Sequence, residues 1–266
     1  MLSKIIFAVL LGLMVIAAIP YGTVEPWWKA AFVCAVFAIC ILAIIDRLAI
    51  DGAPILLPML ALSVLAFVQT FSLGSQEVAG IQVWNAISAD PFQTRFFALQ
   101  MLALTAWLAL LYRYASSEHR VRVLVYTILA IAVVSAIFGI LRQATQHQTG
   151  FALPLLRQGQ GYGQFVNKNH FAYLMEMAFG LGIGMAIARG IKRERLLIYF
   201  ALLLPVWTAL VLSNSRGGIL AMLVQIVSAA LLLSSRWLSH SSVLRVVLLV
   251  VLVAGVLFGT LWVGGD

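Results

Sequence analysis

The sequence predicts an all-α fold: a polytopic integral membrane helix bundle with about nine transmembrane helices. Of the 266 residues, 63% are hydrophobic and only 10% are charged, whereas a soluble domain keeps about a quarter of its residues charged. The apolar residues form continuous runs close to the roughly 17–25 residues that a spanning helix needs. Such runs are too long for the alternating segments of an outer-membrane barrel, so strands are not expected.

These apolar runs set the expected order of elements. The predicted spans lie near residues 4–20, 28–45, 54–74, 95–112, 123–141, 169–188, 196–213, 217–234 and 246–263. Two longer connections, near residues 75–94 and 142–168, are predicted as loops on the outer, periplasmic side. The first run is followed by Pro20 and Tyr21, a poor cleavage context for a signal peptide, so we expect it to remain as a span.

The distribution of Lys and Arg predicts the orientation of the spans. With a cytoplasmic N-terminus, the inner connections hold 11 of the 17 cations: Lys4, Arg47, Arg113, Arg120, Arg122, Arg189, Lys192, Arg193, Arg195, Arg236 and Arg245. The outer side holds the other 6: Lys29, Arg95, Arg142, Arg157, Lys168 and Arg216. Inner connections carry the excess of cations in membrane proteins. We therefore expect a multi-pass protein of a bacterial inner (cytoplasmic) membrane, with Asp266 on the periplasmic side.

The net charge of +8 does not indicate a nucleic-acid-binding protein, because the cations lie mostly in short connections between apolar runs. Cys34 and Cys40 fall inside one apolar run and point to different helix faces, which indicates neither a disulfide nor a zinc site. The sequence contains no cluster of metal ligands, no pair of carboxylates and no nucleophile elbow. We expect no metal, no cofactor and no nucleic-acid partner.

The segment Ser213-Asn214-Ser215-Arg216-Gly217-Gly218 is the first candidate site. Ser and Asn are good N-caps, so the eighth span is expected to begin here. A helix start presents free amides and a partial positive charge, and glycines let a ligand approach the backbone closely. Arg216 adds a planar guanidinium suited to phosphate oxygens. The segment predicts an anion site at the outer membrane face. A capped helix whose Arg216 reaches lipid phosphate is the open alternative.

The loop Arg157–His170 is the second candidate. Its alternating glycines follow no predicted strand, so they do not form a dinucleotide-binding fingerprint. We predict instead a flexible, amide-rich segment that enters the sixth span. Asn167, Asn169 and His170 offer donors and acceptors for sugar hydroxyls, and Lys168 offers positive charge. An interfacial loop with an Asn cap is the alternative.

Two further ionisable residues carry weaker signals. Glu176 is the one carboxylate well inside a predicted span, and such groups usually face a bundle interior or a cavity. A structural hydrogen bond and a functional role are both open for Glu176. His170 alone is weak support for a catalytic base, so the catalytic residue is unassigned.

Three segments together resemble the O-antigen ligase and polymerase superfamily, whose polytopic members handle undecaprenyl-pyrophosphate-linked glycans at the periplasmic face. The matching segments are residues 20–27 (PYGTVEPW), 163–172 (GQFVNKNHFA) and 212–218 (LSNSRGG). The three segments occur in the same order and at similar spacing as in the family, so the resemblance extends over nearly the whole chain. The second segment is the most specific of the three.

The resemblance implies an inverting, metal-independent membrane glycosyltransferase. In that family a periplasmic-side Arg after a Ser binds the pyrophosphate of the donor, and Arg216 is the matching position. We expect Arg216 and the amides of Gly217 and Gly218 to hold the pyrophosphate, assisted by Lys168 or Arg157. The implied partners are an undecaprenyl-pyrophosphate-linked glycan donor, a glycan or lipid A-core acceptor, and membrane lipid.

The family also uses a second Arg and a His in a large periplasmic loop. The chain ends at Asp266, where that loop would begin, so neither residue has a matching position and we expect the N-terminal portion of a longer protein. A flippase or transporter of lipid-linked glycan and a non-catalytic membrane scaffold are the alternatives. A flippase commonly shows internal repeats and a polar path through the bilayer, whereas here no repeat is detected and the candidate cations lie at one face.

Overall fold

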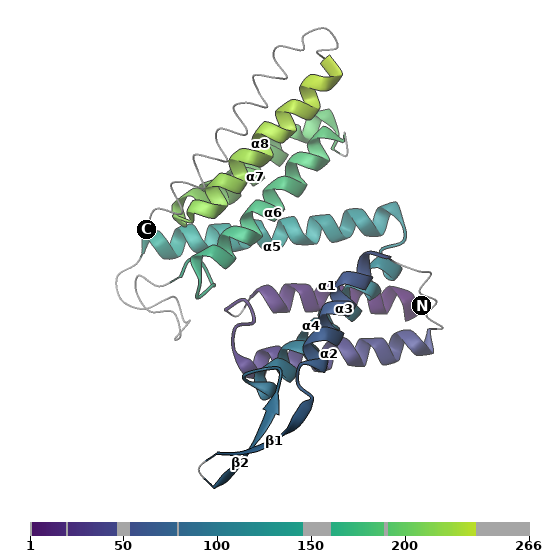
Figure 1. The fold of residues 1–266 in the computed structure, drawn as a ribbon. Coiled ribbons are helices and arrows are strands. Elements are labelled where there is room, and N and C mark those ends of the chain that lie inside the picture. The colour runs from purple at the N-terminus through teal and green to yellow at the C-terminus, as the bar shows by residue number, and fades with distance from the viewer. Residues whose placement is uncertain are drawn as a thin grey trace. The chain divides into compact units, whose positions relative to one another are not determined.

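The computed structural model describes residues 2–19, 21–46, 54–78, 80–145, 161–188 and 191–237 (Figure 1). Eight α-helices lie within these described residues: α1 (Leu2–Ala18), α2 (Pro26–Ile45), α3 (Leu57–Val68), α4 (Pro91–Tyr114), α5 (Glu118–Ala144), α6 (Lys168–Ile187), α7 (Leu196–Leu212) and α8 (Arg216–Trp237). Each of the first eight predicted spans overlaps one of these helices. The ninth predicted span, 246–263, lies outside the described residues.

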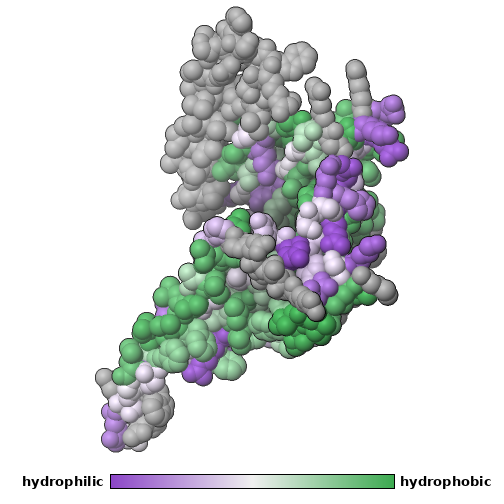
Figure 2. All heavy atoms as spheres, turned by 90° about the vertical axis from the view of Figure 1, so that its right-hand side faces the viewer, coloured by the Kyte–Doolittle hydropathy of each residue, from purple (hydrophilic) through white to green (hydrophobic). Residues whose placement is uncertain are grey.

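Four of the described helices are long and apolar enough to cross a membrane. These helices are α2, α4, α5 and α6. Shorter apolar helices are formed by α1, by α7, by residues 54–68, which include α3, and by residues 216–230 of α8. Figure 2 shows hydrophobic side chains over much of the coloured helical surface on the face drawn, where hydrophilic ones gather in patches. Large side chains such as Leu197, Ile44 and Val134 are exposed, which suits helices that face lipid. The fold therefore indicates a multi-pass membrane protein.

The third predicted span and the loop after it are wrong in detail. Helix α3 ends at Val68, and residues predicted to be helix and loop form an antiparallel hairpin of β1 (Ser72–Val78) and β2 (Ile81–Ala86). Val78 pairs with Ile81, and Gly80 between them has a φ of +80°, a conformation that suits glycine in a tight hairpin turn. Within the described residues the fold is thus all-α apart from this hairpin, which extends away from the helices around it (Figure 1).

The chain divides into two compact units, which we describe separately. Unit 1 comprises residues 1–17 and 23–124, and unit 2 comprises residues 18–22 and 125–266. The core of unit 1 contains buried residues of α1, α2 and α4: Ile6, Phe7, Leu10, Ile39, Ala43, Leu110, Leu111 and Tyr114. The core of unit 2 contains buried residues of α5 to α8 and of the segment before α6: Leu129, Ala132, Ala136, Tyr162, Phe171, Met175, Ala178, Leu203, Val206, Ala209, Leu210 and Met222.

In unit 1, Arg120 joins the ends of several helices. Its Nη1 donates to the Tyr114 carbonyl at 2.8 Å and its Nη2 donates to Ser3 Oγ at 3.1 Å. The Tyr114 hydroxyl donates to Asp46 Oδ2 at 3.1 Å. These contacts bring together the start of α1, the ends of α2 and α4 and the start of α5. The predicted topology is compatible with this arrangement, since it places all four ends on the same side.

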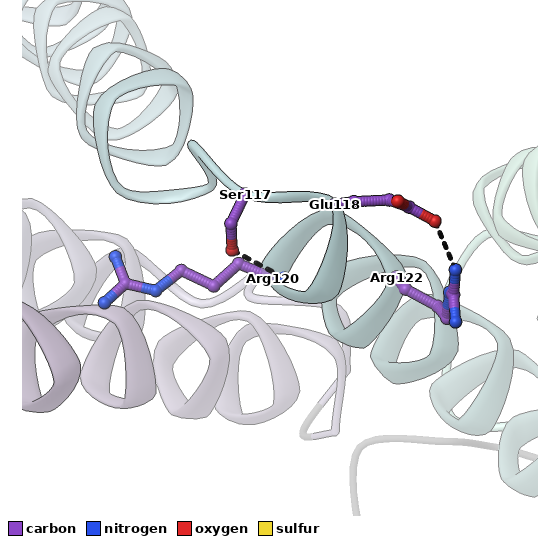
Figure 3. Close-up of polar contacts among 4 residues, drawn as sticks. All are labelled: Ser117, Glu118, Arg120 and Arg122. Atoms are coloured by element: carbon purple, nitrogen blue, oxygen red, sulfur yellow. Dashed lines mark hydrogen bonds and ion pairs between the residues drawn. The ribbon is translucent and has the colours of Figure 1, made fainter.

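The start of α5 is capped and charged at its surface (Figure 3). Ser117 Oγ accepts a hydrogen bond from the Arg120 amide at 3.3 Å, in the manner of an N-cap. Glu118 and Arg122, one turn apart on α5, form an ion pair. Both side chains of the pair are exposed, so it contributes little to stability.

In unit 2, glycines of α6 let neighbouring helices approach closely. A Cβ on Gly182 would lie 2.7 Å from Leu203 of α7, and a Cβ on Gly180 would lie 3.2 Å from Gln225 of α8. The Tyr199 hydroxyl also donates to the Gly182 carbonyl at 3.1 Å. Small residues at such positions permit tight helix packing in a membrane. Helix α6 is therefore packed against both α7 and α8.

Candidate anion site at the starts of two helices

The turn between α7 and α8 presents a capped helix start. Ser213 Oγ donates to the Leu210 carbonyl at 2.6 Å, Asn214 has a φ of +52°, and α8 begins at Arg216. Ser215 is 1% exposed, and its Oγ accepts from the Gly218 amide at 3.4 Å. Ser215 is therefore the N-cap of α8, and the predicted helix start in this segment is confirmed.

Helix α6 has a side-chain cap of the same kind. Asn167 has an extended backbone, and its Oδ1 accepts from the Asn169 amide at 2.8 Å. Lys168 is the first helical residue and is exposed, as are Asn167, Asn169 and His170. The Asn cap that the alternative interpretation gave to the sixth span is thus observed. The four residues predicted to bind ligand lie at the N-cap and in the first turn of α6.

The starts of α6 and α8 lie side by side. The Ser215 hydroxyl donates to Asn169 Oδ1 at 2.9 Å. A Cβ on Gly218 would lie 2.7 Å from the Cβ of Ala172 in α6. Gly218 is buried, so its lack of a side chain is needed for packing. Gly217 is exposed, and a Cβ there would meet nothing within 4 Å; its backbone is open to a ligand.

Two cations at the adjacent helix starts occupy unfavourable positions for positive charge. Lys168 and Arg216 are the first residues of α6 and α8, and neither helix has an acidic residue in its first turn. A helix start carries a partial positive charge and free amides, so acidic residues, not basic ones, are stabilising there. Two helix starts and two cations concentrate positive potential at one end of unit 2. A bound anion would offset this repulsion.

The segment before α6 is an ordered turn in its described part, so the prediction of a flexible segment is wrong for residues 161–167. Tyr162 and Phe165 exchange backbone hydrogen bonds of 3.1 and 3.0 Å. Gly163 lies between them with a φ of +54°, and Gly161 has a φ of +66°. The two glycines serve this turn, because positive φ is strained for residues with a Cβ.

Buried polar side chains anchor the turn. Arg142 Nη1 donates to the Gly163 carbonyl at 2.7 Å. The Gln164 amide group donates to Ser135 Oγ at 2.6 Å and to the Ala18 carbonyl at 3.2 Å. Arg142 was predicted to lie in the outer loop, but it belongs to the last turn of α5 and is only 4% exposed. A cation in the last turn of a helix interacts favourably with the negative end of the helix dipole. This interaction favours Arg142 at the end of α5, although this end is predicted to lie on the outer side.

Aromatic rings complete this anchoring. The rings of Tyr162 and Phe171 lie 4.7 Å apart, and a Cβ on Gly139 of α5 would lie 2.6 Å from the Tyr162 ring. Burial raises the pKa of Tyr162 to about 12. A Cβ on Gly22 would lie 2.4 Å from Phe165, so the segment after α1 packs on the same turn.

Residues from each of the three segments singled out in the sequence are therefore found together in unit 2. Residues 20–27 contribute Gly22, residues 163–172 contribute Phe165, Asn169 and Ala172, and residues 212–218 contribute Ser215 and Gly218. Sequence reasoning counted Arg142 among the outer cations but assigned no role to Arg142, Gln164 or Ser135, because their contacts join residues far apart in the sequence. Arg157 lies outside the described residues.

The remaining candidates show no catalytic arrangement within the described part of the chain. The His170 ring has its centre 6.2 Å from that of Tyr173, and no carboxylate is paired with it there. Glu176 lies on α6, and its buried Oε2 has no hydrogen-bond partner among the described residues. No group of three or more metal-binding side chains is found in the same residues.

Comparison of the chain with known protein families, with curated proteins and with solved structures finds no match. The fold thus indicates a multi-pass α-helical membrane protein, in which two cations begin two adjacent helices.

Proposed function

We propose that the protein is a membrane glycosyltransferase of the O-antigen ligase type, which uses an undecaprenyl-pyrophosphate-linked glycan at the periplasmic face of a bacterial inner membrane. One observation carries the proposal: Lys168 and Arg216 begin two adjacent helices that contain no acidic residue in their first turns. This arrangement favours a multiply charged anion such as pyrophosphate. The resemblance of three segments to that superfamily, and their convergence in unit 2, support the same function.

The donor pyrophosphate would be held by three kinds of group. The Arg216 guanidinium donates in a planar fork, the exposed Gly217 amide donates from the backbone, and Lys168 contributes charge. Gly218 supports the site by packing on Ala172. Its amide, which was also expected to bind, faces Ser215 Oγ at 3.4 Å. Arg157 is proposed as an assisting cation from the preceding loop.

Glycosyl transfer needs stabilisation of the leaving group. An acceptor hydroxyl attacks the anomeric carbon of the donor sugar, the bond from that carbon to the phosphate oxygen breaks, and the configuration inverts. Negative charge grows on the departing undecaprenyl pyrophosphate, so fixed cations and amides lower the barrier. The proton of the acceptor hydroxyl passes to a general base, which is unassigned in this chain.

The sugar would contact the exposed polar residues of the first turn of α6. Asn167 Oδ1 and Asn169 Oδ1 already accept hydrogen bonds from the Asn169 amide and from Ser215. The Nδ2 groups of both side chains are then the donors for sugar hydroxyls, and His170 adds a ring nitrogen that either donates or accepts. Their place beside Lys168 puts glycan contacts next to the pyrophosphate.

The proposed topology has about nine spans, a cytoplasmic N-terminus and periplasmic starts for α6 and α8. The contacts within each unit are compatible with it. In unit 1, Arg120 and Tyr114 together join four helix ends that the topology places inside. In unit 2, the end of α5 and the starts of α6 and α8 meet on the side that it places outside.

Transfer from a lipid-linked donor in proteoliposomes tests the function. The full-length protein receives undecaprenyl-pyrophosphate-linked glycan and acceptor on the periplasmic side only, and product is measured by mass. We expect transfer by the wild type and a loss of about 100-fold for Arg216→Lys, because loss of one preorganised donor has this order of effect. Unchanged transfer by Arg216→Lys removes Arg216 from the donor site. Donor movement across the bilayer without transfer identifies a flippase. The absence of both transfer and donor movement favours a scaffold.

A further inference from the structure

The buried guanidinium of Arg142 is the most unusual feature that the proposed function leaves unused. Arg142 is 4% exposed in the last turn of α5. Burial of a charge is costly, and replacement of buried ionic groups by apolar ones of similar volume is often neutral or stabilising. Filling space therefore does not account for an Arg at this position. Its contact with the Gly163 carbonyl at 2.7 Å does.

The carbonyl of Gly163 sits in the turn that leads into α6. Tyr162 and Phe165 close this turn through a pair of backbone hydrogen bonds, and Gly163 itself packs on Phe171, where an added Cβ would lie 2.7 Å from the ring. Phe171 lies in the first turn of α6 and is fully buried. A contact at Gly163 is thus transmitted to the helix start through packed groups.

Helix α6 in turn fixes the groups proposed to bind the donor. Asn169 accepts from Ser215, the cap of α8, and Ala172 lies against Gly218. Displacement of the α6 start would move Lys168 relative to Arg216. A charge-assisted hydrogen bond of 2.7 Å holds one geometry more strictly than apolar packing does.

We infer that Arg142 is a positioning residue, which latches the turn Tyr162–Phe165 to the end of α5 and so sets Lys168 and Arg216 at the spacing needed for a diphosphate. This inference rests on the proposed function. Because the hydrogen bond of Arg142 ends on the Gly163 carbonyl, its effect reaches the two cations through the turn. A displacement of about 1 Å at a binding site can cost as much as 100-fold in rate.

The test compares Arg142→Met with Arg113→Met in the full chain, in lipid nanodiscs. Arg113 is a matched control, because it too lies in the last turn of its helix but is exposed. Two properties are measured: hydrogen exchange of the peptide covering residues 161–170, and affinity for geranyl diphosphate. For Arg142→Met we expect hydrogen exchange in this peptide to be faster by roughly tenfold or more, and exchange in α7 to be unchanged. The affinity for geranyl diphosphate should fall by roughly tenfold or more, as expected if the cations are displaced by about 1 Å. Arg113→Met should match the wild type.

Arg142→Lys keeps a buried cation and one donor, so exchange and affinity should both recover part of the wild-type values. If Arg142→Met does not fold, Arg142→Lys replaces it as the test variant. The exchange rate and the affinity of Arg142→Lys must then both differ from those of the wild type. Wild-type exchange in Arg142→Met, or faster exchange with wild-type affinity, overturns the inference. Wild-type protein that binds no geranyl diphosphate contradicts the proposed function instead, while the exchange measurement still decides whether Arg142 latches the turn.

Discussion

Ser215 donates a hydrogen bond of 2.9 Å to Asn169, a residue 46 positions earlier in the chain. Each of the two residues takes part in a helix cap. Ser215 is the N-cap of α8, and the backbone N–H of Asn169 donates a hydrogen bond to the side chain of Asn167, the N-cap of α6. The hydrogen bond between Ser215 and Asn169 therefore links the N-terminal caps of α6 and α8 and holds the starts of these two helices together. The cationic site depends on this coupling, because Lys168 and Arg216 are the first residues of these helices.

A double-mutant cycle measures that coupling. Ser215→Ala removes a cap, which costs about 1 kcal/mol, and Asn169→Ala removes the partner. We expect a coupling energy of about 1 kcal/mol between them in thermal or denaturant unfolding. Ser213→Ala is the control, since Ser213 donates within its own helix end. Coupling between Ser213 and Asn169 as large as that of Ser215 would contradict the assigned contact.

The two glycines after Arg216 should respond differently to alanine. Gly218→Ala places a methyl group 2.7 Å from the Ala172 Cβ, and overpacking of this kind costs about 1–3 kcal/mol. Gly217→Ala meets open space, so the folded state should keep its stability while diphosphate affinity falls. Unfolding temperature and geranyl diphosphate binding, measured for both variants, separate these outcomes. Equal losses of stability would show that Gly217 is not open.

The ionisation of Tyr162 should occur far above the ordinary tyrosine range. Burial raises its pKa to about 12, from about 10 in an exposed tyrosine. The uncharged form is thus favoured in the folded state, and this contribution to stability is fully present below about pH 10 and is lost as pH rises through 12. Ultraviolet titration of the wild type minus Tyr162→Phe isolates this one ionisation and should place its midpoint near 12. A midpoint near 10 would mean that the ring is solvated.

Removal of the same hydroxyl should not destabilise the protein. The Tyr162 oxygen is buried and has no hydrogen-bond partner among the described residues, and a buried unsatisfied group costs about 1–3 kcal/mol. Tyr162→Phe keeps the ring contact with Phe171 and should unfold at the same or a higher temperature. A clear decrease in unfolding temperature would reveal a partner for this hydroxyl.

The orientation of the helices can be tested with introduced cysteines. With Cys34 and Cys40 replaced by alanine, Ser75→Cys in the hairpin should react with a membrane-impermeant maleimide in cells whose outer membrane alone is permeabilised. His119→Cys, at the start of α5, should react only after the inner membrane is opened. Both positions are exposed, so access depends on the side of the membrane. The reverse pattern would place the α6 and α8 starts in the cytoplasm.

Local sequence signals predicted the helices and their caps. Continuous apolar runs located α1 to α8, and Asn167 and Ser215 stand where their residue types favour a helix start. The hairpin of β1 and β2 was missed because the apolar run of α3 continues through Phe71 and Leu73, which hid the end of the helix at Val68.

Tertiary contacts account for what the sequence left open. Burial of Arg142 depends on a carbonyl 21 residues further along the chain, and Gln164 bonds to Ala18, 146 residues away. The need for glycine at position 218 comes from Ala172 of another helix. None of these partners lies within the local window that a pattern of residue types reads, so a sequence position alone could not assign them.

Diphosphate affinity tests the central claim most directly. Geranyl diphosphate is titrated into the full chain in lipid nanodiscs, for the wild type, Lys168→Gln, Arg216→Gln and Lys29→Gln. Lys29 is the control, since it also lies in the first turn of a helix but belongs to α2 in unit 1. Charged hydrogen bonds contribute about 1.5–3 kcal/mol, so Lys168→Gln and Arg216→Gln should each weaken binding by roughly 10-fold to 100-fold, and Lys29→Gln should bind like the wild type. Equal affinity in all four proteins would contradict a diphosphate site at the starts of α6 and α8.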